Sequence, residues 1–509
     1  MPNFKTTLWS DLSTPPFAPL EGDLTVDVAV VGGGVTGLTA AHLLTRAGER
    51  VALLESRRVG SGETGKTTAH LTEVLDLRLS ELVRRFGKDA ARLAIRGQRA
   101  AIQRIAALVD ELRIPCQLDF VPAFLWADTA AQAEELHAEQ AAAAELGLPT
   151  HLVTETPLPF SVRAALRFEE QARVHPRAYL DGLVRGLVAE GCRVFETTHV
   201  REIDEGEPCR VVTDQGVVTA RTVIVASGVP ISNRYLIHPK LAAYRTYVVA
   251  FPVQGEAPTA LCFDMGSPYH YVRGHVVDGR PYVIVGGEDH KVGELEDTTQ
   301  PFDALEAWIA QRFHQTPPPE AYRWSGQIIE SADGLPYVGR NSRSSRVFVA
   351  SGYGGNGITG GTLAAAVLAD EIRGVPNDWS ELLAATRLNV RASMRAVIAE
   401  NASYPKHIVT DRLLPLSHKD GLEALPAGEG AVVQIEGEKL AVYRNAQGTL
   451  SAFSPVCPHL GCHVQWNKSS ASWDCPCHGS RFDATGGVLN GPATSGLAPK
   501  PIPRSVRGK

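Results

Sequence analysis

Residues 27–37 read Asp-Val-Ala-Val-Val-Gly-Gly-Gly-Val-Thr-Gly, and this stretch decides the fold of the larger part of the chain. The run up to Val31 is largely apolar, as expected for a buried parallel strand. Residues 38–47 have the composition of a helix, and residues 51–54 form a second apolar strand that ends at Glu55. The order of strand, glycine turn, helix and strand predicts a βαβ unit.

The glycines of this unit have the Gly-x-Gly-x-x-Gly spacing of a dinucleotide-binding turn. Gly32 allows the tight turn, Gly34 lets the backbone approach a pyrophosphate, and Gly37 lets the helix pack closely on the strand. Glu55 is placed to accept hydrogen bonds from the ribose hydroxyls. The spacing alone also occurs in ordinary glycine turns, but the flanking strands and the acidic residue favour a nucleotide site. They do not separate NAD from FAD.

Three later stretches are rich in glycine and hydroxyl side chains. They are residues 60–70 (Gly-Ser-Gly-Glu-Thr-Gly-Lys-Thr-Thr-Ala-His), residues 222–228 (Thr-Val-Ile-Val-Ala-Ser-Gly) and the glycine segments within residues 333–360. In order and kind they resemble the glycine oxidase/D-amino-acid oxidase superfamily of FAD enzymes, over about residues 24–390. In that family the last glycine loop and helix start lie against the flavin ring, where the helix dipole can stabilise anionic reduced flavin.

This resemblance implies an α/β, Rossmann-like FAD-binding domain with an inserted α+β substrate domain built on an antiparallel sheet. It also implies FAD as a cofactor. The residues expected to bind FAD are Gly32, Gly34, Val35, Thr36, Gly37, Glu55, Ser56, Arg57, Thr64, Lys66, Thr67, Thr68, Val200, Ala226, Ser227, Gly228, Asp333, Gly355, Asn356, Gly357, Ile358 and Thr359.

A second informative stretch contains two mixed cysteine–histidine pairs. Residues 457–463 read Cys-Pro-His-Leu-Gly-Cys-His, and residues 473–480 read Trp-Asp-Cys-Pro-Cys-His-Gly-Ser. Such pairs can hold a [2Fe–2S] cluster, with two thiolates on one iron and two imidazoles on the other. Two cysteines and two histidines can also bind zinc, but a zinc finger pairs cysteine with cysteine and histidine with histidine. The mixed pairs therefore favour the iron–sulfur cluster.

The two stretches resemble the disulfide-containing Rieske family. The resemblance implies four cluster ligands and one disulfide: Cys457, His459, Cys475 and His478 as ligands, and Cys462 with Cys477 as the disulfide that joins the ligand loops. Short strands from Leu422 onward predict a small all-β domain, expected to be a separate folding unit. In Rieske folds the two histidines lie at an exposed tip, where a protein or small-molecule electron acceptor would dock.

The segments between the flavin stretches do not fit a doubly wound sheet. Residues 79–112 have helical periodicity, whereas residues 243–252 and 269–286 alternate as antiparallel strands do. We therefore expect a substrate domain made from two insertions. The predicted division is an FAD-binding domain of residues 23–110, 166–240 and 326–398, a substrate domain of 111–165 and 241–325, a linker of 399–421, and a Rieske domain of 422–509.

The insertion sheet contains the candidate substrate contacts, Tyr244, Arg245, Tyr271, Arg273 and His290. Either arginine could pair with a substrate carboxylate through two hydrogen bonds. The tyrosines could enclose an amine or a cation with their π faces. For each residue the alternative is an ordinary position on the solvent-exposed face of the sheet, or on a loop for the histidine.

The whole-chain composition excludes some classes of function. The chain has 509 residues and a formal net charge of −6, so no basic footprint suggests a nucleic-acid partner. Its apolar runs are too short for a membrane span. Residues 1–22 lack the apolar core of a signal peptide, and we expect a cytoplasmic location.

An FAD oxidase domain followed by a Rieske domain resembles a group of bacterial flavoproteins with this domain order. The resemblance implies oxidation of a C–N bond of an amine or amino acid, with hydride transfer to flavin N5 and hydrolysis of the imine. Electrons would then pass singly from FADH2 to the Rieske cluster and on to an external acceptor. The alternative is a flavin oxidase that uses O2, with the Rieske domain as a redox-sensing or structural module. A Rieske oxygenase is disfavoured, because the sequence has no evident 2-His-1-carboxylate stretch.

Overall fold

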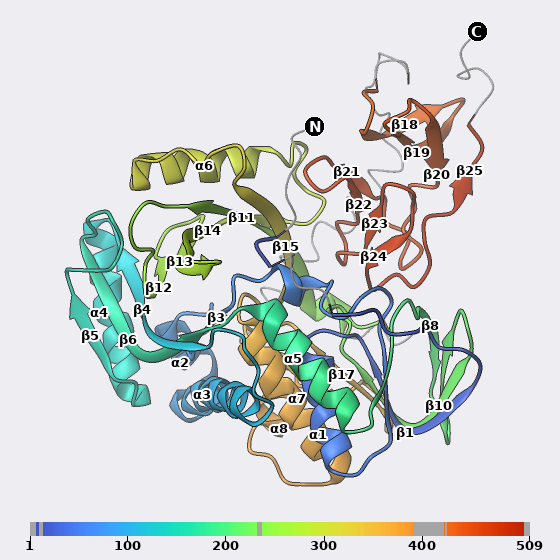
Figure 1. Ribbon diagram of the computed structural model, residues 1–509, viewed down its shortest axis with the longest axis horizontal. Helices are drawn as coiled ribbons and strands as arrows, with labels where there is room; N and C mark the ends of the chain where they lie inside the picture. Colours follow the sequence, from blue (N-terminus) through green and yellow to red (C-terminus); the bar gives the residue numbers. More distant parts are fainter. Residues whose placement is uncertain (1–6, 10–13, 232–236, 390–421, 423–424, 503–509) are drawn as a thin grey trace.

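The computed structural model describes residues 7–9, 14–231, 237–389, 422 and 425–502. Figure 1 shows three parts: an α/β body, a second sheet beside it with the long helix α6 (Gln300–Phe313) on its outer side, and a small all-β part. The predicted linker, residues 399–421, lies outside the described residues. The predicted architecture, an α/β part with an added antiparallel sheet and a small all-β part, is confirmed for the described residues.

The α/β body is built on an eight-stranded sheet of the described residues. Its main path contains β16 (Tyr337–Arg340), β17 (Val347–Ser351), β10 (Val217–Val225), β1 (Leu24–Val31), β2 (Val51–Leu54) and β7 (Arg193–Phe195), in that order. The strands from β17 to β7 are parallel, and β16 is antiparallel. The remaining strands are β8 (Val200–Asp204) and β9 (Cys209–Thr213), which extend the sheet from β10.

Four helices form the largest apolar core together with the parallel strands. They are α1 (Val35–Arg46), α3 (Lys88–Glu111), α5 (Pro176–Ala189) and α7 (Gly357–Arg373). Helix α1 contacts both α5 and α7, so it occupies the middle of this layer, and the short helix α8 (Ser380–Leu383) packs on β16. The periodic stretch 79–112 forms two helices, α2 (Leu79–Phe86) and α3, because Gly87 between them has φ +81°.

The second sheet has nine strands among the described residues. Its path contains β15 (Tyr322–Ser331), β11 (Leu241–Pro252), β14 (Arg280–Lys291), β13 (His270–Val277), β12 (Leu261–Asp264), β4 (Asp119–Ala127), β6 (Ala164–Arg173) and β3 (His70–Leu71), with β5 (Thr150–Val153) paired to β6. Helix α6 packs on β11 and β14, and α4 (Ala130–Leu146) packs on β4 and β6. The predicted domain boundaries stay a prediction.

The small all-β part consists of two four-stranded sheets in the described range. One contains β18 (Gly430–Ile435), β19 (Glu438–Arg444), β20 (Leu450–Phe453) and β25 (Pro499–Lys500), and the other β21 (Gln465–Asn467), β22 (Ser472–Asp474), β23 (Arg481–Asp483) and β24 (Val488–Asn490). This part has its own apolar core, which includes Trp473 and Phe482. Figure 1 shows the second sheet of the pair lying against the larger body, whereas the first lies farther out.

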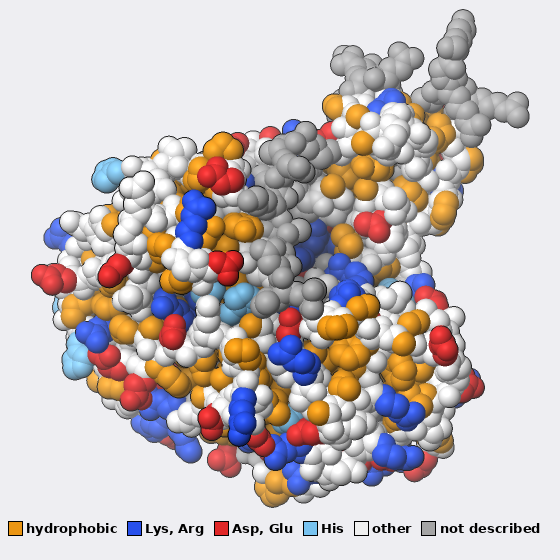
Figure 2. All heavy atoms as spheres, viewed as in Figure 1, with side chains coloured by type: hydrophobic (Ala, Val, Ile, Leu, Met, Phe, Trp, Pro, Cys, Tyr) orange, Lys and Arg blue, Asp and Glu red, His pale blue; other side chains and the backbone are white. Residues whose placement is uncertain are grey.

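The charge distribution on the surface and the length of the helices bear on whether the fold needs a nucleic acid or a bilayer around it. Figure 2 shows acidic and basic side chains interspersed over the larger body on the visible face, without a field of one sign. Within the described ranges, no helix combines the length and the apolarity that a bilayer span requires.

The packing of α1 on β1 depends on a close approach at Gly37. A Cβ atom at this position would lie 1.9 Å from the carbonyl oxygen of Gly32. Gly32 itself has φ +113°, a backbone conformation that favours glycine. The turn and the helix are therefore fixed together by the absence of two side chains.

We expect Gly37→Ala to lower the free energy of unfolding of the α/β body by about 1–3 kcal/mol, the usual cost of forcing a methyl group into a packed site. Chemical denaturation followed by circular dichroism measures this change. Arg46→Ala on the same helix is the control, because the Arg46 side chain is 46% exposed and surface ion pairs contribute little. Equal unfolding free energies for the two variants would contradict the packing argument.

Candidate functional site

A cavity of about 610 Å³ opens where the parallel strands of the α/β body end. The residues that follow β1, β2, β10 and β17 all line it, so the carboxyl ends of four strands meet at this edge. Ligands of doubly wound sheets bind at that edge. The volume lies within the range of about 300–1,000 Å³ that is usual for ligand sites.

Glu55 is held in place by the backbone around the glycine turn. Its Oε2 accepts a hydrogen bond from the Gly33 N–H at 2.8 Å, and its Oε1 accepts one from the Arg57 N–H at 2.9 Å. Because both oxygens are held, the carboxylate has one orientation at the end of β2. The remaining lone pairs of these oxygens can accept further hydrogen bonds at the cavity wall.

The cavity leaves room for a ligand close to the backbone. Gly62, Gly228 and Gly357 line it, and an added Cβ at any of the three would have no atom within 4 Å. Gly357 begins helix α7, whose first N–H groups and positive dipole end favour a negatively charged group. A glycine cradle, a fixed carboxylate and a helix start are the features that hold a dinucleotide, so the residues present fit FAD.

Most residues expected to bind FAD line this cavity. Gly37 lies beneath the turn against Gly32. Thr359 is buried one turn into α7, where its hydroxyl donates to the Asn356 carbonyl oxygen at 3.4 Å. Asp333 does not reach the cavity, because it is fully buried and forms an ion pair with Arg387 at 2.7 Å.

The part of the cavity beneath the second sheet is aromatic and acidic. Tyr269 and Tyr271 line it with ring centroids 5.7 Å apart, and the Tyr271 hydroxyl is 2.9 Å from that of Thr246. Asp289 lies beside Thr246 and Tyr269, and burial raises the pKa of its carboxyl to about 6. Asp76, which accepts a hydrogen bond from the Gly355 N–H, also lines the cavity.

Of the candidate substrate contacts, the structure brings only Tyr271 to the cavity. The Arg273 guanidinium is fully buried and donates to the carbonyl oxygens of Thr68 at 2.8 Å and Ala69 at 2.9 Å. Arg273 therefore supports the loop behind the cavity and does not face a substrate. Tyr269 belongs to the same polar and aromatic stretch of sequence as Tyr271, and it lines the cavity as well.

The other three candidates, Tyr244, Arg245 and His290, also lie outside the cavity lining. Arg245 is buried and donates to the Ser470 hydroxyl at 2.9 Å, so it contacts the all-β part. The His290 Nε2 lies 2.9 Å from the Tyr247 hydroxyl, outside the cavity lining. Tyr244 is half-buried on β11, opposite Lys291, and also lies outside that lining.

The candidate cluster ligands come together on two loops of the all-β part. The Cys457 and Cys475 side chains are buried, and the ring centroids of His459 and His478 lie 5.0 Å apart. Burial lowers the pKa of both imidazoles to about 3, so they are neutral, the form that binds a metal. Two thiols and two neutral imidazoles at this spacing fit a [2Fe–2S] cluster.

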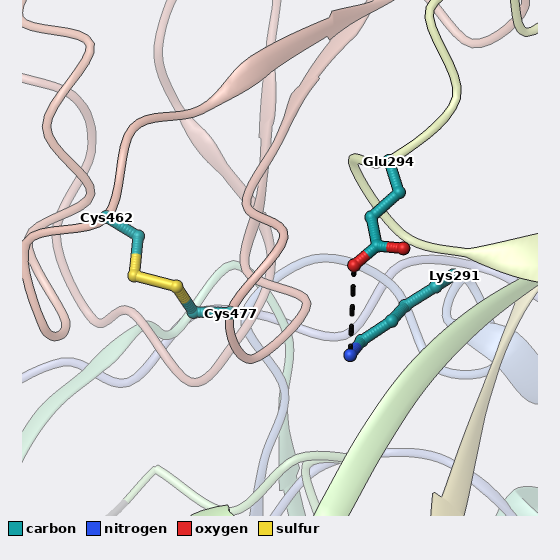
Figure 3. Close-up of a disulfide and its surroundings, with 4 residues drawn as sticks. All are labelled: Lys291, Glu294, Cys462 and Cys477. Atoms are coloured by element: carbon teal, nitrogen blue, oxygen red, sulfur yellow. Dashed lines mark ion pairs between the residues drawn. A yellow bond between two sulfur atoms is a disulfide. The ribbon is translucent and has the colours of Figure 1, made fainter. Parts of the chain in front are cut away.

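A disulfide between Cys462 and Cys477 joins these loops, with Cα atoms 6.5 Å apart (Figure 3). The sulfur atoms of Cys462, Cys475 and Cys477 all lie within 4.8 Å of one another. On the neighbouring segment of the second sheet, Lys291 and Glu294 form an ion pair at 3.8 Å (Figure 3). The disulfide thus holds the ligand loops together where they meet the larger body.

The expectation that both histidines lie at an exposed tip is wrong for His478, and His459 is half-buried. His478 is only 6% exposed, and the ring of His238 from the α/β body lies 5.7 Å from it and 4.7 Å from the ring of His459. The all-β part turns its histidine side toward the larger body. An external partner can therefore not reach both imidazoles in this arrangement.

Two family models match the chain. The model described as FAD dependent oxidoreductase matches residues 27–371, and the model described as Rieske [2Fe-2S] domain matches residues 418–501.

Similar proteins include the Rieske 2Fe-2S iron-sulfur protein YhfW of Bacillus subtilis (strain 168), 32% identical over 495 residues and covering 96% of both chains. The gamma-glutamylputrescine oxidoreductase of Escherichia coli (strain K12) is 27% identical over 383 residues, which cover 70% of this chain and 86% of the relative. Among solved structures, glycine oxidase from Geobacillus kaustophilus superposes with a TM-score of 0.62 at 21% identity, covering 72% of this chain and 99% of the other. At that identity the structural likeness speaks for the fold alone.

Glu55→Ala should weaken FAD retention at least about tenfold, because a charge-assisted hydrogen bond contributes roughly 1.5–3 kcal/mol. The change also leaves the Gly33 and Arg57 N–H groups without their acceptor. FAD fluorescence released during dialysis measures retention. Glu49→Ala, which removes only a surface ion pair with Arg221, is the control. Unchanged FAD occupancy in Glu55→Ala would argue against this role of Glu55.

The purified chain should contain about two iron and two sulfide per polypeptide, the content of one [2Fe–2S] cluster. Cys457→Ser should remove both, because one iron loses a thiolate ligand. Cys209→Ser, which changes a buried cysteine of β9, should keep both. Metal and acid-labile sulfide analysis decides, and zinc in place of iron after iron-replete expression would contradict the cluster assignment.

Proposed function

Because the chain belongs to the family of FAD-dependent oxidoreductases and carries a C-terminal Rieske [2Fe–2S] domain, we propose that it oxidises a C–N bond of an amine or amino acid and passes the electrons singly from FADH2 through the cluster to an external acceptor. FAD takes up a hydride as two electrons, and a [2Fe–2S] cluster carries one electron at a time. The fusion would thus convert a two-electron oxidation into one-electron transfers.

One observation carries the proposal for electron flow. Gln327 of β15 lines the FAD cavity, and its side-chain Nε2 donates a hydrogen bond to the Gly479 carbonyl oxygen at 2.9 Å. Gly479 follows the candidate ligand His478 directly in the chain. A single residue therefore separates the cavity from the loop that would hold the cluster, and this short separation favours transfer within one molecule.

The chemistry of the cavity supports a nitrogen-containing substrate. Tyr269 and Tyr271 present aromatic faces that can attract an amine cation. Asp76 and Glu330 line the same cavity, and Asp289 stands behind Thr246 and Tyr269. The E. coli relative is named for gamma-glutamylputrescine, an amine whose oxidation to an imine and subsequent hydrolysis would break a C–N bond.

Binding of a substrate carboxylate would need a residue other than those expected. Arg245 and Arg273 do not line the cavity. Arg78 at the start of α2 does line it, and a guanidinium can bind a carboxylate through two hydrogen bonds. We assign an amino-acid carboxylate to Arg78, whereas an amine without a carboxylate would rely on the tyrosines and the acidic residues.

The predicted docking position of the external acceptor also changes. The imidazoles face His238, but the first ligand loop has an open side, on which Leu460 is 44% exposed directly after His459. We place the external acceptor on this side of the loop and not at the histidine tip.

A second function has support from a different observation. Residues 488–491 of the all-β part line the FAD cavity. For this second function, the Rieske domain would close the cavity as a structural or redox-sensing module, and the reduced flavin would react with O2 alone.

Anaerobic addition of an amine that bleaches the flavin should produce the electron paramagnetic resonance signal of a reduced Rieske cluster. In Cys475→Ser, which removes a cluster ligand, bleaching should occur without that signal. Cys209→Ser should behave as the unchanged chain, because Cys209 packs in a core of the α/β body and not in the core that contains the cluster ligands. A bleached flavin with an oxidised cluster in the unchanged chain would favour the second function.

A further inference from the structure

The all-β part contributes a wall to the FAD cavity. Its strand β24 provides Val488, Leu489 and Asn490, and the residues Gly491 and Ala493 follow on the same wall. Figure 1 shows β24 as the strand of this part nearest the α/β body. The cavity that fits FAD is therefore complete only with residues from beyond the FAD-binding part.

Glu63 joins this wall to the two other parts of the molecule. Its Oε1 accepts hydrogen bonds from the Asn490 Nδ2 at 2.9 Å and from the Lys66 Nζ at 3.0 Å. Its Oε2 accepts one from the Gln327 N–H at 2.6 Å. One carboxylate thus connects the loop after β2, the second sheet and the all-β part at the edge of the cavity.

The surrounding charges keep this carboxylate ionised. Burial alone would raise the pKa of Glu63, but the positive charges of Lys66, Arg245 and Arg481 together lower it to about 2. Hydrogen bonds to an ionised acceptor are stronger than those between neutral groups. The Asn490 contact is therefore a strong link and not an incidental surface contact.

The loop that contains Cys475, His478 and Gly479 packs tightly against the second sheet. A Cβ at Gly479 would lie 2.3 Å from the Gln327 Nε2 and 2.4 Å from the Ala243 Cβ. On the adjoining side, a Cβ at Gly293 would lie 2.9 Å from the Pro476 nitrogen. Glycine at position 293 lets two backbone segments come into contact, and glycine at position 479 leaves room for the side chains of Gln327 and Ala243.

Further polar contacts secure the same interface at its margins. The Ser469 N–H donates to the Thr298 hydroxyl at 3.0 Å, and Arg201 donates to the Thr494 carbonyl oxygen. A displaced all-β part would break these contacts and the one at Gly479 together, and it would open the FAD cavity to water. Docking of this part and closure of the cavity are therefore the same event.

We propose that the Rieske domain is permanently docked as a wall of the FAD cavity, that Asn490 ties this wall to the FAD-binding part, and that Gln327 is the positioning residue that fixes the cluster loop against the cavity. The role of Asn490 in closing the cavity does not depend on the direction of electron flow. The positioning role of Gln327 rests on the proposed transfer of electrons from flavin to cluster.

Asn490→Leu tests the wall in the full-length holoprotein. The variant leaves Glu63 without one donor and should accelerate FAD loss during dialysis by roughly tenfold, the factor that about 1.4 kcal/mol represents. Iron and sulfide content should not change. Gln447→Leu, the same loss of an amide on an exposed turn of the same domain, is the matched control. If the variant retains FAD as well as the control does and keeps its cluster, Asn490 does not tie the all-β part to the FAD cavity.

Gln327→Leu tests the positioning role. Photoreduction of the bound flavin with light and EDTA replaces the unidentified substrate, and the subsequent reduction of the cluster is followed by its absorbance. Transfer should slow by at least about tenfold, while the midpoint potential of the cluster stays unchanged. A purely structural defect would alter the potential or the cluster content instead, and an unchanged transfer rate would overturn the role.

Added glycerol gives a measurement that needs no variant. A permanently docked domain predicts a transfer rate independent of viscosity, whereas a domain that must move predicts a rate that falls with viscosity and would overturn the proposal. If the cluster of the unchanged chain never accepts electrons from the flavin, the proposed function fails. The Asn490→Leu experiment still decides the docking in that case.

Discussion

The contact between helix α1 and strand β1 at Gly37 is the constraint on which the rest of the structure depends. The helix can begin directly above the strand end only because no side chain separates Gly37 from the Gly32 carbonyl oxygen. That position puts the helix start, Glu55 and the loops after β10 and β17 around a common cavity. The second sheet and the all-β part then close the space that these elements leave open.

The features that sequence could predict are those encoded by neighbouring residues. The turn from Gly32 to Gly37, the acidic end of β2 and the two cysteine–histidine pairs each lie within a short segment, so their spacing already fixes their geometry. The candidate arginines differ, because alternation in a strand says which residues share a face but not which face meets the cavity. The pairing of β11 with β14 is irregular between Arg245 and Tyr247, and a bulge there changes the direction of the side chains.

The placement of the Rieske domain could not be predicted for a related reason. Its contacts join residues far apart in the sequence, such as Asn490 and Glu63, which are separated by 427 positions. Glu63 belongs to the glycine-rich stretch of residues 60–70, but nothing in that stretch indicates a partner in the all-β part, and Asn490 belongs to no recognisable motif. Their pairing depends on the complementary shape of three parts, to which glycines such as Gly479 contribute by having no side chain. Local patterns contain no information of this kind.

The buried histidine side of the Rieske domain has a consequence for how the protein matures. His478 is almost inaccessible once it packs beside His238, and the disulfide between Cys462 and Cys477 joins the same loops. A biosynthetic machinery that delivers iron and sulfide needs access to those loops. Cluster insertion must therefore precede the docking of the all-β part on the larger body.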